Sequence, residues 1–159
     1  MDQRIMRRGV LVASLAAAVI GGFALTGSVS GQQVGSGDIV ADRQRLMALN
    51  GASAKDLNDK AKAGNIEAIA VNAETLALNA RHIPALFPKG SMTDKSYAKA
   101  EIWDKWAEFE AAAKNLEEKA IALRDAAKKN DTAAVQGMLP NFGREACGTC
   151  HTPFRRPKN

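Results

Sequence analysis

The sequence predicts an all-α protein, an antiparallel up-down-up-down four-helix bundle, from three observations. Apolar residues recur at spacings of three and four over long stretches, which is the period of an amphipathic helix. No stretch shows the pattern of a strand. Glycine and proline cluster at a few places, and these clusters divide residues 38–154 into four helical segments.

The first two predicted helices span about residues 38–63 and 65–81. Asp38 can cap the start of the first helix, and Gly64 can end it. Pro84 stops the second helix. Because the connection between them is short, the two helices should be antiparallel neighbours.

The last two predicted helices span about residues 97–129 and 132–154, after a long connection at 83–97. The third carries the clearest apolar stripe, with steps of four and three that indicate close packing. This stripe consists of Ile102, Trp106, Phe109, Ala113, Leu116, Ala120 and Leu123. Pro140 lies inside the fourth helix, so a kink or break is expected near Leu139.

The last helix carries a short run with a specific chemistry, Cys147-Gly-Thr-Cys150-His151. A Cys-x-x-Cys-His run is the attachment site of a c-type haem. Each thiol adds to one haem vinyl group, and the histidine takes one axial position on the iron. The three residues are spaced i, i+3 and i+4, so they share one face of a helix.

Other functions of these cysteines fit less well. A thioredoxin-like motif expects a βαβ context, which the surrounding sequence lacks. A structural zinc site needs about four ligands, and His82 stands too far from Cys147 for a finger-like spacing. A structural disulfide leaves the adjoining His151 unexplained. The motif therefore predicts one covalently attached haem c.

Residues 1–30 have the pattern of a secretory signal peptide, with Arg4, Arg7 and Arg8 before an apolar run. Small residues follow, and cleavage after Ser30 leaves a domain of residues 31–159. An uncleaved anchor is the weaker alternative, because the apolar run is near the lower limit for spanning a bilayer. Haem attachment to reduced thiols also takes place outside the cytoplasm. We expect a periplasmic protein with no stable membrane span after cleavage.

The exported part is mildly basic. It keeps 19 of the 22 basic and 16 of the 17 acidic residues, for a net charge of +3. Its few aromatic residues do not interleave with a basic stripe, so nucleic acid is not an expected partner.

Three segments together resemble the class II c-type cytochromes, the cytochrome c′ family, including its low-spin methionine-ligated relatives. They are residues 42–47 on the first helix, 101–109 on the third and 147–155 at the end. The resemblance extends over nearly the whole exported chain. It implies a covalent haem held between the helices of the bundle.

The resemblance also implies roles for individual residues. His151 would be the proximal iron ligand, and Met47 would cover or bind the distal side. Arg43 and Gln44 would lie near the propionates or haem edge, and Arg155 near the proximal histidine, where its charge favours neutral imidazole. Pro153 departs from the expected last turn and affects where Arg155 is placed. The implied cofactor contacts are Cys147, Cys150, Arg43, Gln44, Phe109 and Arg155.

Met47 separates two expected functions. If its sulfur binds iron, the haem is low-spin and suits electron transfer with redox partner proteins, which is the function we expect from the sequence. If it is only a steric lid, the protein is a high-spin, five-coordinate cytochrome c′ that binds NO or CO. A haem enzyme such as a peroxidase ranks last, because the first helix offers Arg43 but no distal histidine. A homodimer through the first two helices is plausible.

Overall fold

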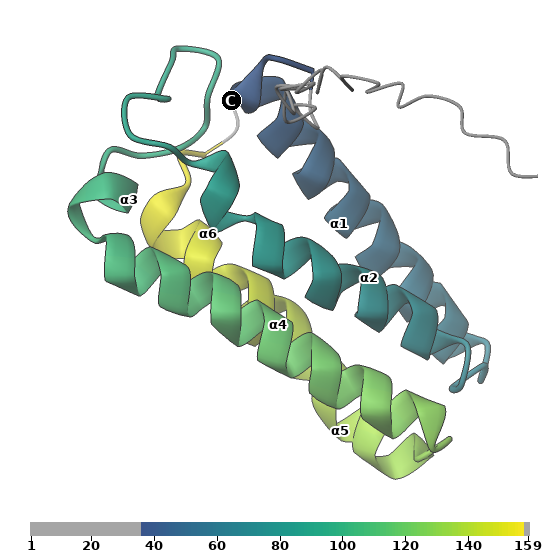
Figure 1. The fold of residues 1–159 in the computed structure, drawn as a ribbon. Coiled ribbons are helices and arrows are strands. Elements are labelled where there is room, and N and C mark those ends of the chain that lie inside the picture. The colour runs from purple at the N-terminus through teal and green to yellow at the C-terminus, as the bar shows by residue number, and fades with distance from the viewer. Residues whose placement is uncertain (1–35, 158–159) are drawn as a thin grey trace, which may run out of the picture. The chain divides into compact units, whose positions relative to one another are not determined.

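The computed structural model describes residues 36–157, and its main helices run alternately up and down (Figure 1). The predicted signal peptide, residues 1–30, lies outside the described residues. The main helices are α1 (Ile39–Lys62), α2 (Ile69–His82), α4 (Trp106–Lys128) and a final run of α5 (Thr132–Phe142), η2 (Gly143–Cys147) and α6 (Gly148–Phe154). Two short elements, η1 (Pro84–Leu86) and α3 (Glu101–Asp104), lie in the long connection and before α4. The predicted four-helix bundle is confirmed.

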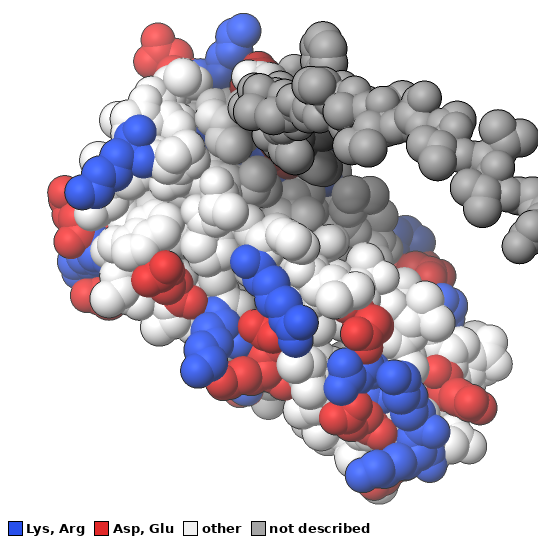
Figure 2. Space-filling view, viewed as in Figure 1, with Lys and Arg blue, Asp and Glu red and all other residues white. Residues whose placement is uncertain are grey.

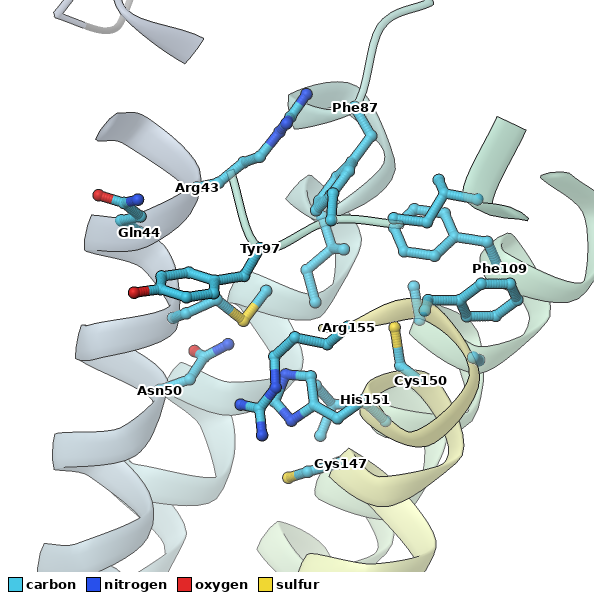
Figure 3. Close-up of a pocket in the computed structure, with 18 of the residues that line it drawn as sticks. Arg43, Gln44, Asn50, Phe87, Tyr97, Phe109, Cys147, Cys150, His151 and Arg155 are labelled. Atoms are coloured by element: carbon cyan, nitrogen blue, oxygen red, sulfur yellow. The ribbon is translucent and has the colours of Figure 1, made fainter. Parts of the chain in front are cut away.

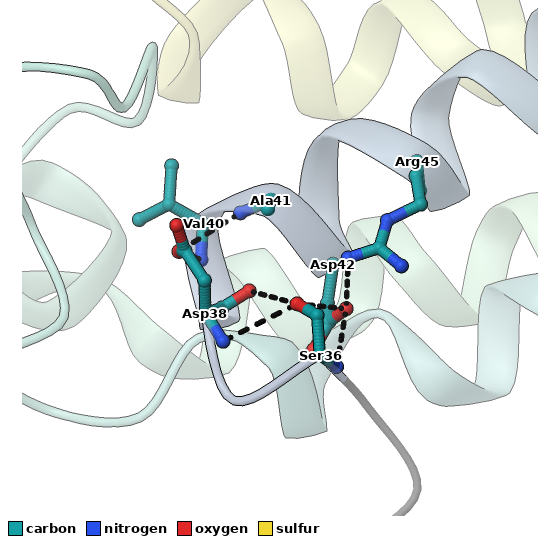
Figure 4. A network of polar contacts seen from close by, with 6 residues as sticks. All are labelled: Ser36, Asp38, Val40, Ala41, Asp42 and Arg45. Atoms are coloured by element: carbon teal, nitrogen blue, oxygen red, sulfur yellow. Dashed lines mark hydrogen bonds and ion pairs between the residues drawn. The ribbon is translucent and has the colours of Figure 1, made fainter.

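α1 begins where the sequence predicts, because Asp38 caps it. The Asp38 carboxylate accepts hydrogen bonds from the backbone N–H groups of Val40 and Ala41, at 3.0 and 3.1 Å. Ser36 donates from its hydroxyl to the carboxylate of Asp42 at 3.0 Å, which fixes the chain entering the helix (Figure 4). These contacts satisfy N–H groups that a helix start leaves without partners.

α2 begins at Ile69, four residues later than predicted. The preceding residues form tight turns instead, in which Ile69 N–H donates to Ile66 O at 3.1 Å and Ala70 N–H to Glu67 O at 3.0 Å. Before these turns, Gly64 has φ +76°, a left-handed conformation that suits glycine after a helix end. The turn reverses the chain, so α1 and α2 are antiparallel.

The predicted single helix at 97–129 is wrong at its start. Helix begins only at Glu101, and Lys105 breaks it with φ −120° and ψ 47° between α3 and α4. Residues before Glu101 pair with the C-terminal segment instead: Lys99 N–H donates to Phe154 O at 3.0 Å, and Ala98 forms an isolated antiparallel bridge with Arg155. The apolar stripe itself is confirmed, and only its Trp106 is partly exposed.

The last helix does not break near Leu139, because α5 runs through Pro140 to Phe142. The irregularity comes later, at η2, a π-helical turn in which Gly148 N–H donates to Gly143 O. Inward residues here step repeatedly by four, from Met138 through 142, 146 and 150 to 154. A straight α-helix turns once per 3.6 residues, so such steps drift around it. One extra residue in a π-helical turn absorbs this drift.

The core lies around α2 and α4, which pack against each other along their length (Figure 1). α1 packs on α2, and the α5–α6 run packs on α4. The largest fully buried side chains are Phe109, Leu57, Ile69, Leu76, Ile102, Leu123 and Val135. No helix in the described part of the chain is long and apolar enough to cross a membrane.

Ion pairs join the outer edges of α2 and α4. Arg81 pairs with Glu117 at 2.5 Å, and Arg124 pairs with Glu74 at 2.8 Å. On the face drawn in Figure 2, basic and acidic side chains are interleaved and form no continuous basic stripe. Such exposed pairs contribute little individually.

Candidate functional site

A cavity of about 620 Å³ lies between α1 and α6, with α2 and α4 forming its inner wall. This volume falls within the usual range for cofactor and ligand pockets. All eight residues that the sequence singled out line this one cavity, and all of them except Met47 are labelled in Figure 3. They are Arg43, Gln44, Met47, Phe109, Cys147, Cys150, His151 and Arg155.

The C-terminal wall carries Cys147, Cys150 and His151. The π-helical turn Gly143–Cys147 contains Cys147 and rotates the following α6 relative to α5, by about 100° per extra residue. The turn is held from α4, where Asn115 Nδ2 donates to Glu145 O at 2.6 Å. Lys119 also pairs with the Glu145 carboxylate at 3.0 Å. The turn and its two contacts therefore orient the two cysteine thiols and the candidate iron ligand, His151.

On this wall, burial favours the uncharged forms of the two thiols and of the imidazole. Burial raises the pKa of the Cys147 thiol, and burial together with Cys147 raises the pKa of Cys150 to about 11. Burial, and then the nearby charge of Arg155, lowers the pKa of His151. Near neutral pH both cysteines are thiols and the imidazole is neutral. Among the described residues, neither ring nitrogen of His151 is hydrogen-bonded, so a lone pair is free to bind a metal.

The α1 wall carries Arg43, Gln44, Met47 and Asn50. Met47 lines the cavity there and is half-buried. Gln44 is exposed at the rim, and its Nε2 donates to Lys95 O at 3.0 Å. This wall is the part of α1 that faces α6 across the cavity.

Arg43 lines the cavity and also hydrogen-bonds to the long connection. Its side chain is 4% exposed, and the guanidinium turns toward the long connection (Figure 3). It donates to Leu86 O, to the Ser91 hydroxyl and to Ser91 O, the last at 3.1 Å. It also stacks over the Phe87 ring at 4.2 Å. Arg43 thus fixes residues 86–91 against α1, and burial lowers its pKa.

Aromatic side chains form the apolar end of the cavity. Phe109 is buried and touches three other rings, with centroid distances of 4.8 Å to Phe87, 5.5 Å to Trp106 and 5.6 Å to Phe154. Edge-to-face and tilted pairs at these distances stabilise each other beyond their simple burial. The cluster gives a flat hydrophobic cofactor a rigid apolar surface.

Residues 95–98 cover one side of the cavity, which the sequence did not indicate. Arg156 holds them: its guanidinium donates to Ser96 O, and its backbone N–H donates to Tyr97 O at 2.8 Å. Tyr97 and Ser96 then line the cavity next to Arg155. No local pattern reveals these residues, because their placement depends on a pairing some sixty positions apart in the chain.

The donor set and the cavity fit a c-type haem. Two thiols and one free imidazole occupy one wall, and the rest of the lining is mainly apolar, as a porphyrin requires. A zinc site lacks ligands, since the described residues hold no group of three or more His, Cys, Asp or Glu side chains able to bind a metal ion.

A four-helix bundle with this motif on its last helix defines a class of c-type haem proteins. Comparison with known families narrows the class. The family model described as Cytochrome C′ matches residues 38–155, and the chain belongs to this family. The cofactor of the family is a covalently attached haem c.

Curated relatives agree with this assignment. The cytochrome c′ of Rhodospirillum rubrum is 36% identical over 74 residues, which cover 46% of this chain and 50% of that protein. Cytochrome c-554 of Cereibacter sphaeroides is 38% identical over 76 residues, covering 46% and 56%. The chain thus spans about half the length of the curated relatives it matches.

Solved structures share the fold. Cytochrome c′ from Thermochromatium tepidum has a TM-score of 0.68 at 23% identity, covering 75% of this chain and 95% of that one. A nitric oxide complex of a variant cytochrome c prime from Alcaligenes xylosoxidans has a TM-score of 0.67 at 23% identity, covering 77% and 96%. At this identity the likeness establishes the four-helix fold alone.

Proposed function

We propose that this protein binds a small diatomic molecule, NO or CO, at a five-coordinate haem. The observation that carries the proposal is the arrangement of one cavity, with Cys147, Cys150 and His151 on one wall and Met47 on the α1 wall. When bound, the haem would supply an iron able to take up a diatomic ligand.

Residues on different walls of the cavity would have different roles toward the haem. Cys147 and Cys150 would hold the haem through thioether bonds, and neutral His151 would take the proximal position. Phe109 and its neighbouring rings would pack against the apolar part of the haem. Gln44 and Arg155, both exposed at the rim, would lie near its polar edge. Met47 would limit the size of any ligand on the distal side.

The comparisons support gas binding over the electron transfer that the sequence led us to expect. A protein of the same fold has been solved as a nitric oxide complex. Electron transfer stays a second candidate for one reason: Met47 presents a thioether to the same cavity as His151, and His/Met ligation raises the reduction potential. In neither function does the chain turn over a substrate.

Met47→Leu separates the two functions, because leucine keeps similar bulk but cannot bind iron. Under gas binding, the variant keeps the high-spin optical spectrum of the wild-type protein and still binds CO. Under electron transfer, the wild-type protein has a low-spin His/Met spectrum, and the variant loses it. A low-spin wild-type spectrum that Met47→Leu abolishes would overturn the proposal.

We also infer that the chain is exported and works in the periplasm. The sequence pattern of residues 1–30 and a haem-attachment motif that functions outside the cytoplasm support this. Mass spectrometry of the protein from a bacterial host should give a mature chain beginning at or within a few residues of Gly31. A full-length chain in the cytoplasmic fraction would contradict this.

A further inference from the structure

Asn50 is a polar residue on the α1 wall that has no part in the proposed attachment of the haem or in the size of the distal space. It follows Met47 by three positions, so the two side chains lie on one face of α1. Asn50 is half-buried and lines the cavity. Figure 3 shows it extending from α1 on the side of the cavity opposite Cys147 and His151.

A neighbour on α2 hydrogen-bonds the oxygen end of the Asn50 amide. Asn79 Nδ2 donates to Asn50 Oδ1 at 2.8 Å. An asparagine side chain has one acceptor end and one donor end. With the acceptor engaged by Asn79, the Nδ2 of Asn50 is left to donate, and among the described residues it has no hydrogen-bond partner.

The other polar side chains of this wall are already committed. Arg43 donates to the connection at Leu86 and Ser91. Gln44 donates to the Lys95 carbonyl at the rim. Among these polar side chains of the described α1 wall, Asn50 is the half-buried one whose Nδ2 group makes no hydrogen bond, so both of its N–H donors are available to a ligand inside the cavity.

We propose that Asn50 is a specificity-determining residue that donates a hydrogen bond to the bound diatomic, and that Asn79 is the positioning residue that orients it. This inference rests on the proposed gas-binding function. A donor beside the ligand favours molecules that gather negative charge on their outer atom, and distal donors are among the features that decide which ligand a haem takes. Met47 would then limit the size of the ligand, and Asn50 would favour ligands whose outer atom accepts a hydrogen bond.

The test is the infrared C–O stretch of the CO complex of the intact haem protein. A donor near the CO oxygen draws electron density onto the ligand and lowers the stretching frequency. Asn50→Leu should raise that frequency and weaken CO affinity about fivefold, the net contribution of one neutral hydrogen bond. Asn58→Leu is the matched control, because Asn58 donates to Ala54 O on the same helix, is exposed and does not line the cavity.

Asn79→Asp tests the orientation without changing Asn50. The new carboxylate only accepts, so the Asn50 amide must turn its Nδ2 toward α2 and its Oδ1 toward the cavity. The C–O frequency should then rise at least as far as in Asn50→Leu.

Two failures are distinguishable. A wild-type protein that binds no CO overturns the proposed function. A wild-type protein that binds CO, with a frequency unchanged in both Asn50→Leu and Asn79→Asp, overturns the role of this pair alone.

Discussion

In the proposed function, Met47 would limit the space on the distal side of the bound haem. Met47→Ala removes most of the side chain, so CO affinity should rise by at least about fivefold. The reason is that relief of steric crowding is typically worth about 1–3 kcal/mol. Laser-flash rebinding and equilibrium titration with CO measure this directly. Unchanged CO affinity would mean that Met47 does not limit the pocket.

Arg155 acts on His151 through charge. Burial is the larger cause of the lowered pKa of His151, and the positive charge of Arg155 lowers it further. Arg155→Gln removes this charge, so the His151 pKa rises and protons compete with iron for the imidazole at higher pH. The acid transition of the Soret band should therefore move upward, by about one pH unit at most because Arg155 is exposed.

Arg144→Gln is the matched control for this change. Arg144 is an exposed arginine on the same helical run that pairs with Asn141 and Glu145 and does not line the cavity. Its acid transition should coincide with that of the wild-type protein. A downward shift in Arg155→Gln would contradict the electrostatic argument.

Among the secondary-structure elements, the π-helical turn η2 matters most for the site, because it contains Cys147 and leads directly into α6, which carries Cys150 and His151. Asn115→Leu removes the side-chain donor to the carbonyl of Glu145, a partly buried hydrogen bond. We expect a loss of about 1–3 kcal/mol in the free energy of unfolding by urea, the usual cost of an unsatisfied buried group. The electron paramagnetic resonance spectrum of the ferric haem should also change, because His151 would tilt.

Lys119→Met serves as the comparison for Asn115→Leu. It removes an ion pair whose side chains are 37% and 41% exposed, so the expected cost is below about 1 kcal/mol. The haem spectrum should stay as in the wild-type protein. If both variants alter the spectrum equally, the hydrogen bond from Asn115 is not what holds the turn.

The sequence predicts helices well where local signals decide them. Asp38 and Gly64 mark the ends of α1, and the stripe from Ile102 to Leu123 identifies α4. It fails where distant segments compete: residues 96–99 pair with the C-terminal segment and delay the helix that the local pattern favours. The repeated steps of four before Phe154 indicate the π-helical turn. The prediction of a break near Leu139 relied on Pro140 instead, and α5 continues through that proline.

At the scale of the whole molecule, the motif and the resemblance found the residues of the site but not all their contacts. The eight predicted residues do meet at one cavity. The turn of Arg43 toward the connection, the cover at residues 95–98 and the Asn50–Asn79 pair could not be predicted. Each depends on a side chain meeting a segment 29 or more positions away, and single-sequence periodicity carries no such information.

The outer faces of α1 and α2 expose apolar side chains that suit a second copy of the chain. Leu49, Val71 and Leu78 are 58%, 68% and 47% exposed. We propose that they contribute to a homodimer, in which case Val71→Lys should shift the protein toward monomer in light scattering. Lys114→Gln, an exposed change on α4, should not. A wild-type protein that is monomeric at high concentration would contradict the proposal.

We propose above that the cavity between α1 and α6 holds a covalent haem with an open distal position. The optical spectrum of the reduced protein, recorded before and after CO addition, tests it most directly. We expect a high-spin, five-coordinate spectrum whose Soret band shifts sharply when CO binds. A low-spin six-coordinate spectrum that CO leaves unchanged would contradict it.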